Sequence, residues 1–215
     1  GGFSGCSRLT SITIPESVTY VASGTFEGCS NLKSFGGKLA SEDGRCLIIN
    51  GELVGFSSAG LTEYTIPDGV TAIGCAFYDC SSLTSITIPD SVTSIGEWAF
   101  GGCESLASVT IPDSVTSIGA EAFMDCKNLK EVVLPKGLKK IGREVFRLCV
   151  ELTSIVIPEG VTEIGWGAFW KCKNLQAINL PEGVKKIETR AFTRCEKLAT
   201  ITLPASVRSI KTNFT

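Results

Sequence analysis

A 23-residue repeat runs through most of this chain and limits the folds that it can adopt. Eight phenylalanines share one register, and a cysteine follows each of them three residues later. The phenylalanines are Phe3, Phe26, Phe77, Phe100, Phe123, Phe146, Phe169 and Phe192. One unit of this length is too short to bury its own apolar face, so units must stack on copies of themselves. The repeat therefore predicts a solenoid.

Residues 83–105 show how one coil is built. Ile86 and Ile88 alternate with polar residues, which is typical of a half-buried strand. Pro89 ends this run because it cannot donate a hydrogen bond to a neighbouring strand, and all eight prolines of the chain hold the same position. A second short extended segment ends at Gly96, and a tight turn leads to the next unit. The side chains expected inside this coil are Leu83, Ile86, Ile88, Val92, Ile95, Ala99, Phe100 and Cys103.

The repeated pattern L-x-x-I-x-I-P-x-x-V-x-x-I-G-x-x-A-F-x-x-C resembles the leucine-rich repeats of BspA-like bacterial cell-surface proteins over residues 3–210. We therefore predict that residues 1–215 form a single leucine-rich repeat domain. The expected fold is a β-rich solenoid, a curved right-handed superhelix of about nine coils with a parallel sheet on its concave face. The resemblance also implies a cell-surface or secreted bacterial protein.

One unit, at about residues 33–60, departs from the pattern. Phe26 and Phe77 are 51 residues apart instead of 46. Within this interval the sequence RCLIINGELVGF predicts a β-hairpin, because Asn50-Gly51 is a strong two-residue turn signal. The hairpin is interpreted either as a decoration of an ordinary coil or as a protruding contact surface.

The ten cysteines do not indicate a disulfide framework. Eight of them occupy the same place in successive units, where side chains point in one direction and not toward each other. We predict that this ladder is reduced and buried, and that it does not bind zinc, whose ligands must converge on one point. Cys46 and Cys75 lie outside the ladder and are predicted to be the more reactive thiols.

Composition argues against catalysis, cofactors and nucleic acid. The chain has no histidine, which removes the commonest general base and the commonest metal ligand. The net charge is −2, although residues 1–107 carry 4 basic and 11 acidic side chains (−7) and residues 108–215 carry 16 and 11 (+5). No apolar segment approaches the roughly 18 residues of a membrane span. We expect no enzyme activity, no cofactor and no membrane insertion by these residues.

Candidate partner-binding residues fall into two groups. Outward positions of the first strand form a small, hydroxylated surface, and tryptophans occur near the turn after the second strand. The candidates are Ser85, Thr87, Ser108, Thr110 and Glu131 on the strands and Trp98, Trp166 and Trp170 near the turns. A basic stripe is the alternative site, with Lys139, Lys140, Lys185, Lys186 and Arg208 and with Arg143, Arg147, Arg190, Arg194 and Lys211 nearby. We expect the hydroxyl surface and the aromatic edge to bind, because buried aromatic anchors outweigh exposed, salt-screened charges.

Three functions are compatible with these features. The first is recognition of host or neighbouring-cell proteins, with extracellular matrix proteins among the ligands that the resemblance suggests. A rigid structural spacer within a larger surface protein is the second, and a glycan-binding module that uses the tryptophans is the third. Because both ends of a solenoid present unpaired strand edges, we also expect an end-to-end or edge-mediated homodimer.

Overall fold

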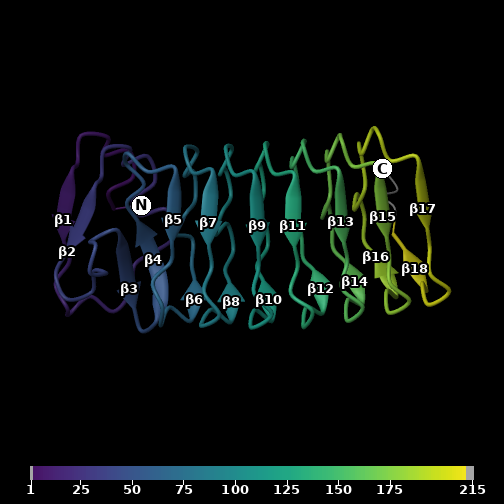
Figure 1. Ribbon diagram of the computed structural model, residues 1–215, viewed down its shortest axis with the longest axis horizontal. Helices are drawn as coiled ribbons and strands as arrows, with labels where there is room; N and C mark the ends of the chain where they lie inside the picture. Colours follow the sequence, from purple (N-terminus) through teal and green to yellow (C-terminus); the bar gives the residue numbers. More distant parts are fainter. Residues whose placement is uncertain (1, 212–215) are drawn as a thin grey trace.

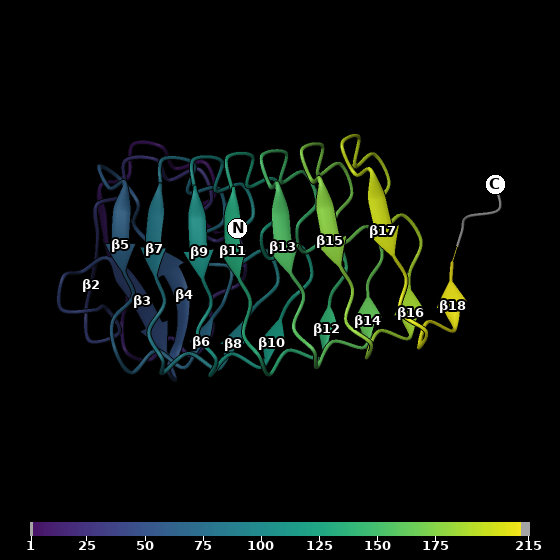
Figure 2. The ribbon, with the colours of Figure 1, turned by 45° about the vertical axis from the view of Figure 1, so that its right-hand side comes forward.

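The computed structural model describes residues 2–211 and is a β-solenoid that contains no helix within this range. Its coils lie side by side along the longest axis of the molecule (Figure 1). The predicted β-solenoid of about nine coils of about 23 residues is confirmed. Each regular coil contributes two short strands, which form two rows along the molecule (Figures 1 and 2).

The first row consists of three-residue strands. Its strands are β1 (Ser11–Thr13), β2 (Ser34–Gly36), β5 (Glu63–Thr65), β7 (Ser85–Thr87), β9 (Ser108–Thr110), β11 (Glu131–Val133), β13 (Ser154–Val156), β15 (Ala177–Asn179) and β17 (Thr200–Thr202). They pair in parallel and in register within four groups, β1 with β2, β5 with β7, β9 with β11, and β13 with β15 and β17. In β7 the central Ile86 pairs with Tyr64 and is buried, whereas Ser85 and Thr87 are exposed. The alternation predicted for this strand is therefore present.

The second row consists of shorter strands on another side of each coil. Its regular members are β6 (Ala72–Ile73), β8 (Ser94–Ile95), β10 (Ser117–Ile118), β12 (Lys140–Ile141), β14 (Glu163–Ile164), β16 (Lys186–Ile187) and β18 (Ser209–Ile210). Each of these strands ends in an isoleucine, and the six from Ile73 to Ile187 are buried. A turn then crosses the remaining side and leads to the next first-row strand.

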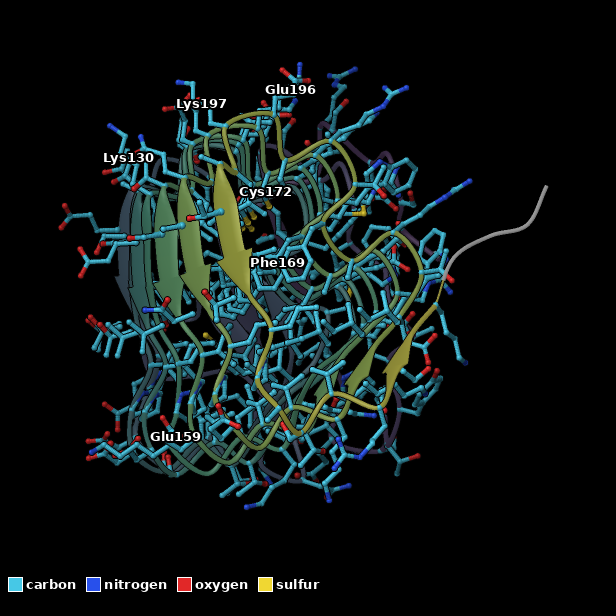
Figure 3. The ribbon with its side chains drawn as sticks, turned by 90° about the vertical axis from the view of Figure 1, so that its right-hand side faces the viewer. Lys130, Glu159, Phe169, Cys172, Glu196 and Lys197 are labelled. Atoms are coloured by element: carbon cyan, nitrogen blue, oxygen red, sulfur yellow. The ribbon has the colours of Figure 1, made fainter. Side chains whose placement is uncertain are left out.

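Phenylalanine rings fill the interior between the strands and the turns. The rings of Phe77, Phe100, Phe123, Phe146 and Phe169 are fully buried. Consecutive rings among these five stack with centroids 5.1 to 5.7 Å apart and planes inclined by 8 to 16°. In the view down the axis, Phe169 and Cys172 lie inside the coil (Figure 3). Truncating any of these rings would remove contacts within its own coil and in both neighbours.

In the first part of a regular turn, before the ladder cysteine, backbone hydrogen bonds run toward the following coil. In each turn from the one after β8 to the one after β14, three N–H groups donate to carbonyl oxygens of the following coil. One such set joins the nitrogens of Trp98, Phe100 and Gly102 to the oxygens of Ala120, Ala122 and Met124, at 3.1, 2.8 and 2.8 Å. Two residues of this turn, Trp98 and Gly102, have left-handed backbone conformations, with φ of 59° and 74°.

Glycine precedes these turns because adjacent coils approach closely there. A Cβ atom on Gly119 would lie 2.4 Å from the backbone nitrogen of Glu97. A Cβ atom on Gly165 would lie 2.7 Å from the carbonyl carbon of Gly142. The neighbours in both cases are backbone atoms, so a side chain at either position would push two coils apart.

The cysteine ladder is buried as predicted from Cys29 to Cys172 and adds hydrogen bonds that spacing alone did not reveal. From Cys103 onward each thiol donates to the carbonyl oxygen of the phenylalanine one coil earlier. The sulfur–oxygen distances are 3.2 Å for Cys103 and Phe77, 3.1 Å for Cys126 and Phe100, 3.2 Å for Cys149 and Phe123, and 3.0 Å for Cys172 and Phe146. The thiol thus satisfies a polar backbone group inside an apolar core.

The irregular coil contains the predicted hairpin, formed by β3 (Cys46–Ile49) and β4 (Glu52–Phe56). Asn50 and Gly51 form its turn with left-handed φ angles of 52° and 81°. Strand β4 also pairs in parallel with β6, so the hairpin belongs to the second row of strands. Most of its apolar side chains are buried. The interpretation of the hairpin as a decorated coil therefore fits, and that of a protruding surface does not.

The prediction that Cys46 is reactive is wrong. Its side chain is fully buried at the start of β3, with the sulfur 3.2 Å from the hydroxyl oxygen of Tyr64. The Tyr64 hydroxyl in turn donates to Asp43 at 2.9 Å. Burial raises the pKa of the Cys46 thiol to about 11. The exposed thiol is instead that of Cys6, a member of the ladder, whereas Cys75 is half-buried.

We predict that three thiols react under native conditions. Cys6 is exposed and should be labelled first by a disulfide reagent at pH 8, followed by the half-buried Cys75 and Cys195, whose pKa values are raised by burial. Mass spectrometry of labelled peptides should find the other seven of the ten cysteines modified only after denaturation. Rapid native labelling of Cys46 or Cys126 would contradict this assignment.

The thiol–carbonyl bonds should contribute to stability. We expect Cys126→Ala to lower the free energy of unfolding by about 1–2 kcal/mol, because it removes a buried donor and leaves a small cavity. Cys6→Ala is the matched control and should change it by less than about 0.5 kcal/mol, since the Cys6 side chain is exposed. Denaturant unfolding of the two variants provides the comparison, and equal losses would argue against the role of the buried thiol.

Candidate functional site

The structure places the predicted binding residues on two sides of the solenoid. The five strand candidates belong to β7, β9 and β11 and are all exposed. The tryptophan candidates lie near the turns that follow the second-row strands β8 and β14. Viewed down the axis, the first row of strands forms one side of the coil, and the turns lie beyond the core that contains Phe169 (Figure 3). The hydroxyl surface and the aromatic edge are therefore separate surfaces.

The first-row surface repeats from coil to coil. Ser108 pairs with Glu131, and Thr110 pairs with Val133 one coil later. Two valines interrupt the row of hydroxyl groups, and of these Val133 is 46% and Val156 is 82% exposed. This side of the molecule combines small hydroxyl groups with a few exposed β-branched side chains.

Trp166 and Trp170 form an aromatic pair in the turn after β14. Their ring centroids are 5.9 Å apart, the planes are inclined by 76°, and both side chains are half-buried. Gly167 between them has a φ of 60°, and a Cβ atom there would lie 3.1 Å from Cγ of Glu144. The absence of a side chain at this position leaves room for the carboxylate of the preceding coil next to the tryptophans.

Arginines from the two neighbouring coils lie over these rings. Arg143 is 5.6 Å from the Trp166 ring centroid and Arg147 is 4.5 Å from that of Trp170. From the following coil, Arg190 is 5.6 Å from the first ring and 5.3 Å from the second. We call these five residues the tryptophan–arginine patch. The aromatic edge and the arginines were predicted as alternative sites, whereas the structure joins them.

Two buried carboxylates fix the arginines of the preceding coil. Arg143 Nη2 lies 3.3 Å from both Glu121 Oε1 and Glu144 Oε2, and Arg147 Nη1 lies 3.0 Å from Glu144 Oε1. Glu121 and Glu144 are only 5% and 2% exposed, and both have left-handed φ angles. Burial, and secondarily the nearby Glu144, raises the pKa of Glu121, while Arg143 opposes this shift. The arginines are thus oriented before any partner arrives.

Trp98 lies in a different environment. Its ring meets that of Tyr78 edge to face, with centroids 5.4 Å apart, over Gly101. The turn of Trp98 precedes that of Trp166 by three coils, which corresponds to about 14 Å at the usual spacing of strands. Trp98 is therefore not part of the tryptophan–arginine patch.

Within the described residues, no group of three or more histidine, cysteine, aspartate or glutamate side chains could hold a metal ion. Between residues 2 and 211 there is no helix that is long and apolar enough to cross a membrane. Glu121 and Glu144 occupy equivalent positions of adjacent coils, and both carboxylates are engaged by arginines.

Comparison with known proteins gives one consistent result. The family described as BspA type leucine rich repeat region matches residues 1–39, 54–175 and 139–214, in six copies. No curated protein sequence matches the chain significantly.

Several solved structures are similar to this chain. A leucine-rich repeat protein from Eubacterium ventriosum is 28% identical, with a TM-score of 0.75, covering 92% of this chain and 56% of its own. A leucine rich cell surface protein from Faecalibacterium prausnitzii is 31% identical, with a TM-score of 0.59, and the match covers 93% of this chain and 61% of that protein. The leucine-rich repeat protein of T. pallidum is 30% identical, with a TM-score of 0.64, and the match covers 89% of this chain and 78% of that protein. The chain thus spans less than two thirds of the first two proteins.

The two buried glutamates should respond differently to neutralisation. Because the pKa of Glu121 is raised on folding, its ionised form costs stability at pH 7, and this cost disappears as the pH falls through the folded pKa toward the unfolded one. Glu121→Gln should therefore preserve or increase the free energy of unfolding at pH 7. Glu144→Gln should decrease it, because Arg143 and Arg147 both lose an ionic partner.

Urea unfolding at pH 7 and pH 4 measures both effects. The difference between Glu121→Gln and the parent chain should shrink at the lower pH, where the parent carboxyl becomes protonated. A loss of more than about 1 kcal/mol for Glu121→Gln at pH 7 would mean that its pairing with Arg143 outweighs burial.

Proposed function

Because this chain belongs to the BspA-type leucine-rich repeat family, we propose that it is a protein-recognition module of a bacterial cell-surface or secreted protein. In this proposal it mediates adhesion to host or neighbouring-cell proteins, and extracellular matrix proteins are the first class to test. The similar Faecalibacterium prausnitzii protein is described as a leucine rich cell surface protein, which supports the location.

The observation that carries the proposal is the tryptophan–arginine patch. Tryptophan and arginine are among the residues enriched at the energetic centres of protein interfaces, where one side chain can contribute about 2 kcal/mol or more. Here both tryptophans are only half-buried, so their remaining surface is available to a partner. The patch spans three successive coils, with arginines on both sides of the aromatic pair.

Preorganisation is the second argument for binding at this patch. Ordering a long side chain on binding costs about 0.5–1.5 kcal/mol, and a side chain that is already fixed avoids most of this cost. Glu144 and the rings hold Arg147, whose side chain is only 27% exposed. Arg143 is held by two carboxylates but remains 62% exposed, so its guanidinium can also meet a partner.

The first-row strand surface is proposed as a second, broader contact area. Ser85, Thr87, Ser108, Thr110 and Glu131 present exposed polar side chains on three successive first-row strands. Such a surface supports shape complementarity more than high affinity per residue, because exposed polar side chains gain little on binding. A partner that contacts both surfaces must extend around the solenoid.

Glycan binding is less well supported by this arrangement. Sugar-binding sites usually need an open aromatic face for stacking, whereas Arg147 lies 4.5 Å over the Trp170 ring. The Trp166 ring has Arg143 and Arg190 at 5.6 Å each. A rigid spacer, the other alternative, would bind no protein through this fragment.

The proposal is tested with the fragment of residues 1–215 against purified extracellular matrix proteins and surface proteins of co-resident bacteria. We expect at least one to bind, and the Trp166→Ala/Trp170→Ala variant to bind at least tenfold more weakly, equivalent to about 1.4 kcal/mol. Affinity is measured by biolayer interferometry, and thermal unfolding verifies that the variant is folded.

Lys139→Glu/Lys140→Glu serves as the matched control, because Lys139 precedes β12 and Lys140 begins it, before the turn that carries Arg143 and Arg147. Their reversal should change the affinity by less than threefold at physiological salt. Binding to a glycan array would favour the glycan-binding module. The absence of any protein or glycan ligand would favour the rigid spacer. If the lysine reversal abolishes binding and the tryptophan variant does not, the basic stripe is the site.

A further inference from the structure

The row of turns is interrupted at the irregular coil. Regular turns contain two left-handed residues and bulge outward, as at Trp98 and Gly102. In the irregular coil β4 instead runs straight to Phe56, and residues 57–60 lead directly to the next first-row strand. One turn is therefore missing between the turn of residues 24–28 and the turn of residues 75–79.

The missing turn leaves a cavity of about 330 Å³. Its two walls are the adjacent turns, residues 24–30 and 75–82, and its floor is formed by residues 54–56 and 58–60. We call this cavity the turn gap. Its volume is at the lower end of the range for ligand pockets, which suits a few residues of an extended chain.

The backbone groups on the two walls lack the partners that they have elsewhere. By repeat position, the N–H groups of Phe26 and Gly28 should donate to the missing turn, and within the described residues neither has an acceptor. On the opposite wall the carbonyl oxygens of Ala76 and Tyr78 should accept from the missing turn, and within the same range neither has a donor. Donors thus face acceptors across the turn gap.

A polypeptide backbone is the chemical group that satisfies both walls at once. The four turns from Trp98 to Lys171 each accept hydrogen bonds from the coil before and donate to the coil after. An extended peptide in the turn gap would do the same, with its carbonyl oxygens toward Phe26 and Gly28 and its N–H groups toward Ala76 and Tyr78. This is recognition by backbone pairing, as when a peptide adds a strand to the edge of a sheet.

The charge of the turn gap favours a basic peptide. The residues that line it include the acidic Glu27 and Asp79 and no lysine or arginine. Residues 1–107 around it carry a net charge of −7, from 4 basic and 11 acidic side chains. A lysine or arginine next to the paired backbone would find an opposite charge on either wall.

We propose that the turn gap binds an extended basic segment of a partner protein, which takes the place of the missing turn. This site is separate from the tryptophan–arginine patch, so each can function or fail without the other. Cys75 lies at one end of the turn gap, and its thiol donates to the carbonyl oxygen of Trp98 in the following coil, at 4.0 Å.

The first experiment uses a capped hexapeptide of alternating lysine and valine and an isotope-labelled chain. In nuclear magnetic resonance titrations we expect the amide signals of residues 24–30 and 75–82 to shift, and hydrogen exchange at Phe26 and Gly28 to slow at least tenfold. A glutamate–valine hexapeptide should bind at least tenfold more weakly. Shifts confined to distant parts of the chain would overturn the proposal.

A second peptide separates backbone pairing from simple charge attraction. N-methylation at alternate residues retains the lysine side chains but removes N–H donors, and it should weaken binding at least tenfold if Ala76 and Tyr78 accept from the peptide. Equal binding of the methylated and unmethylated peptides would reject backbone pairing.

Variants of the chain complete the test. Ala59→Phe fills the floor of the turn gap and Glu27→Gln/Asp79→Asn removes its charge, so each should weaken binding at least tenfold. Asp90→Asn/Glu159→Gln removes two charges outside the turn gap and is the matched control, expected to bind normally. Thermal unfolding establishes that each variant is folded.

Two further measurements separate peptide binding in the turn gap from binding at the patch and from self-association. The Trp166→Ala/Trp170→Ala variant should bind the peptide as the parent does, since the patch is not part of the turn gap. If sedimentation instead shows that a second copy of the chain occupies the turn gap and excludes the peptide, the proposed basic partner is wrong.

Discussion

Each coil of this protein pairs its backbone N–H and C=O groups, and buries its apolar side chains, against the coils on either side. Turn N–H groups donate to the next coil, thiols donate to the phenylalanine carbonyls of the previous coil, and phenylalanine rings stack on both. Because these partners come from neighbouring coils, stability grows with the number of stacked units. The same dependence fixes the identity of the interior residues and leaves the exterior positions free to vary.

Most of the fold could be predicted because interior positions repeat. The strand at Ser85–Thr87, the buried rings and the turn at Asn50-Gly51 follow from periodicity and local turn chemistry. The burial of Cys46 could not be predicted in this way. It depends on contact with Tyr64, which lies 18 residues further along the chain and packs there only because the hairpin joins the second row.

The binding surfaces were only partly predictable. The 23-residue spacing places Arg143 before Trp166 and Arg147 before Trp170 at equivalent positions of adjacent coils, so this signal is present in the sequence. It is missed when residues are grouped along one coil instead of across coils. The turn gap is harder to foresee, because it results from a turn that is absent and not from any residue that is present.

The part of each turn that precedes the ladder cysteine has a polarity, because its N–H groups donate to the following coil. Among residues 2–211, unpaired carbonyl oxygens face outward at one end of the row of turns, and unpaired N–H groups do so at the other end. A two-fold dimer through either end would place like groups against each other in this row, whereas head-to-tail contact pairs unlike groups and also brings the acidic first half toward the basic second half. Such heterologous contacts do not close on themselves. In this part of the turns, contact between unlike ends therefore extends along the solenoid axis, whereas contact between like ends leaves these backbone groups unpaired.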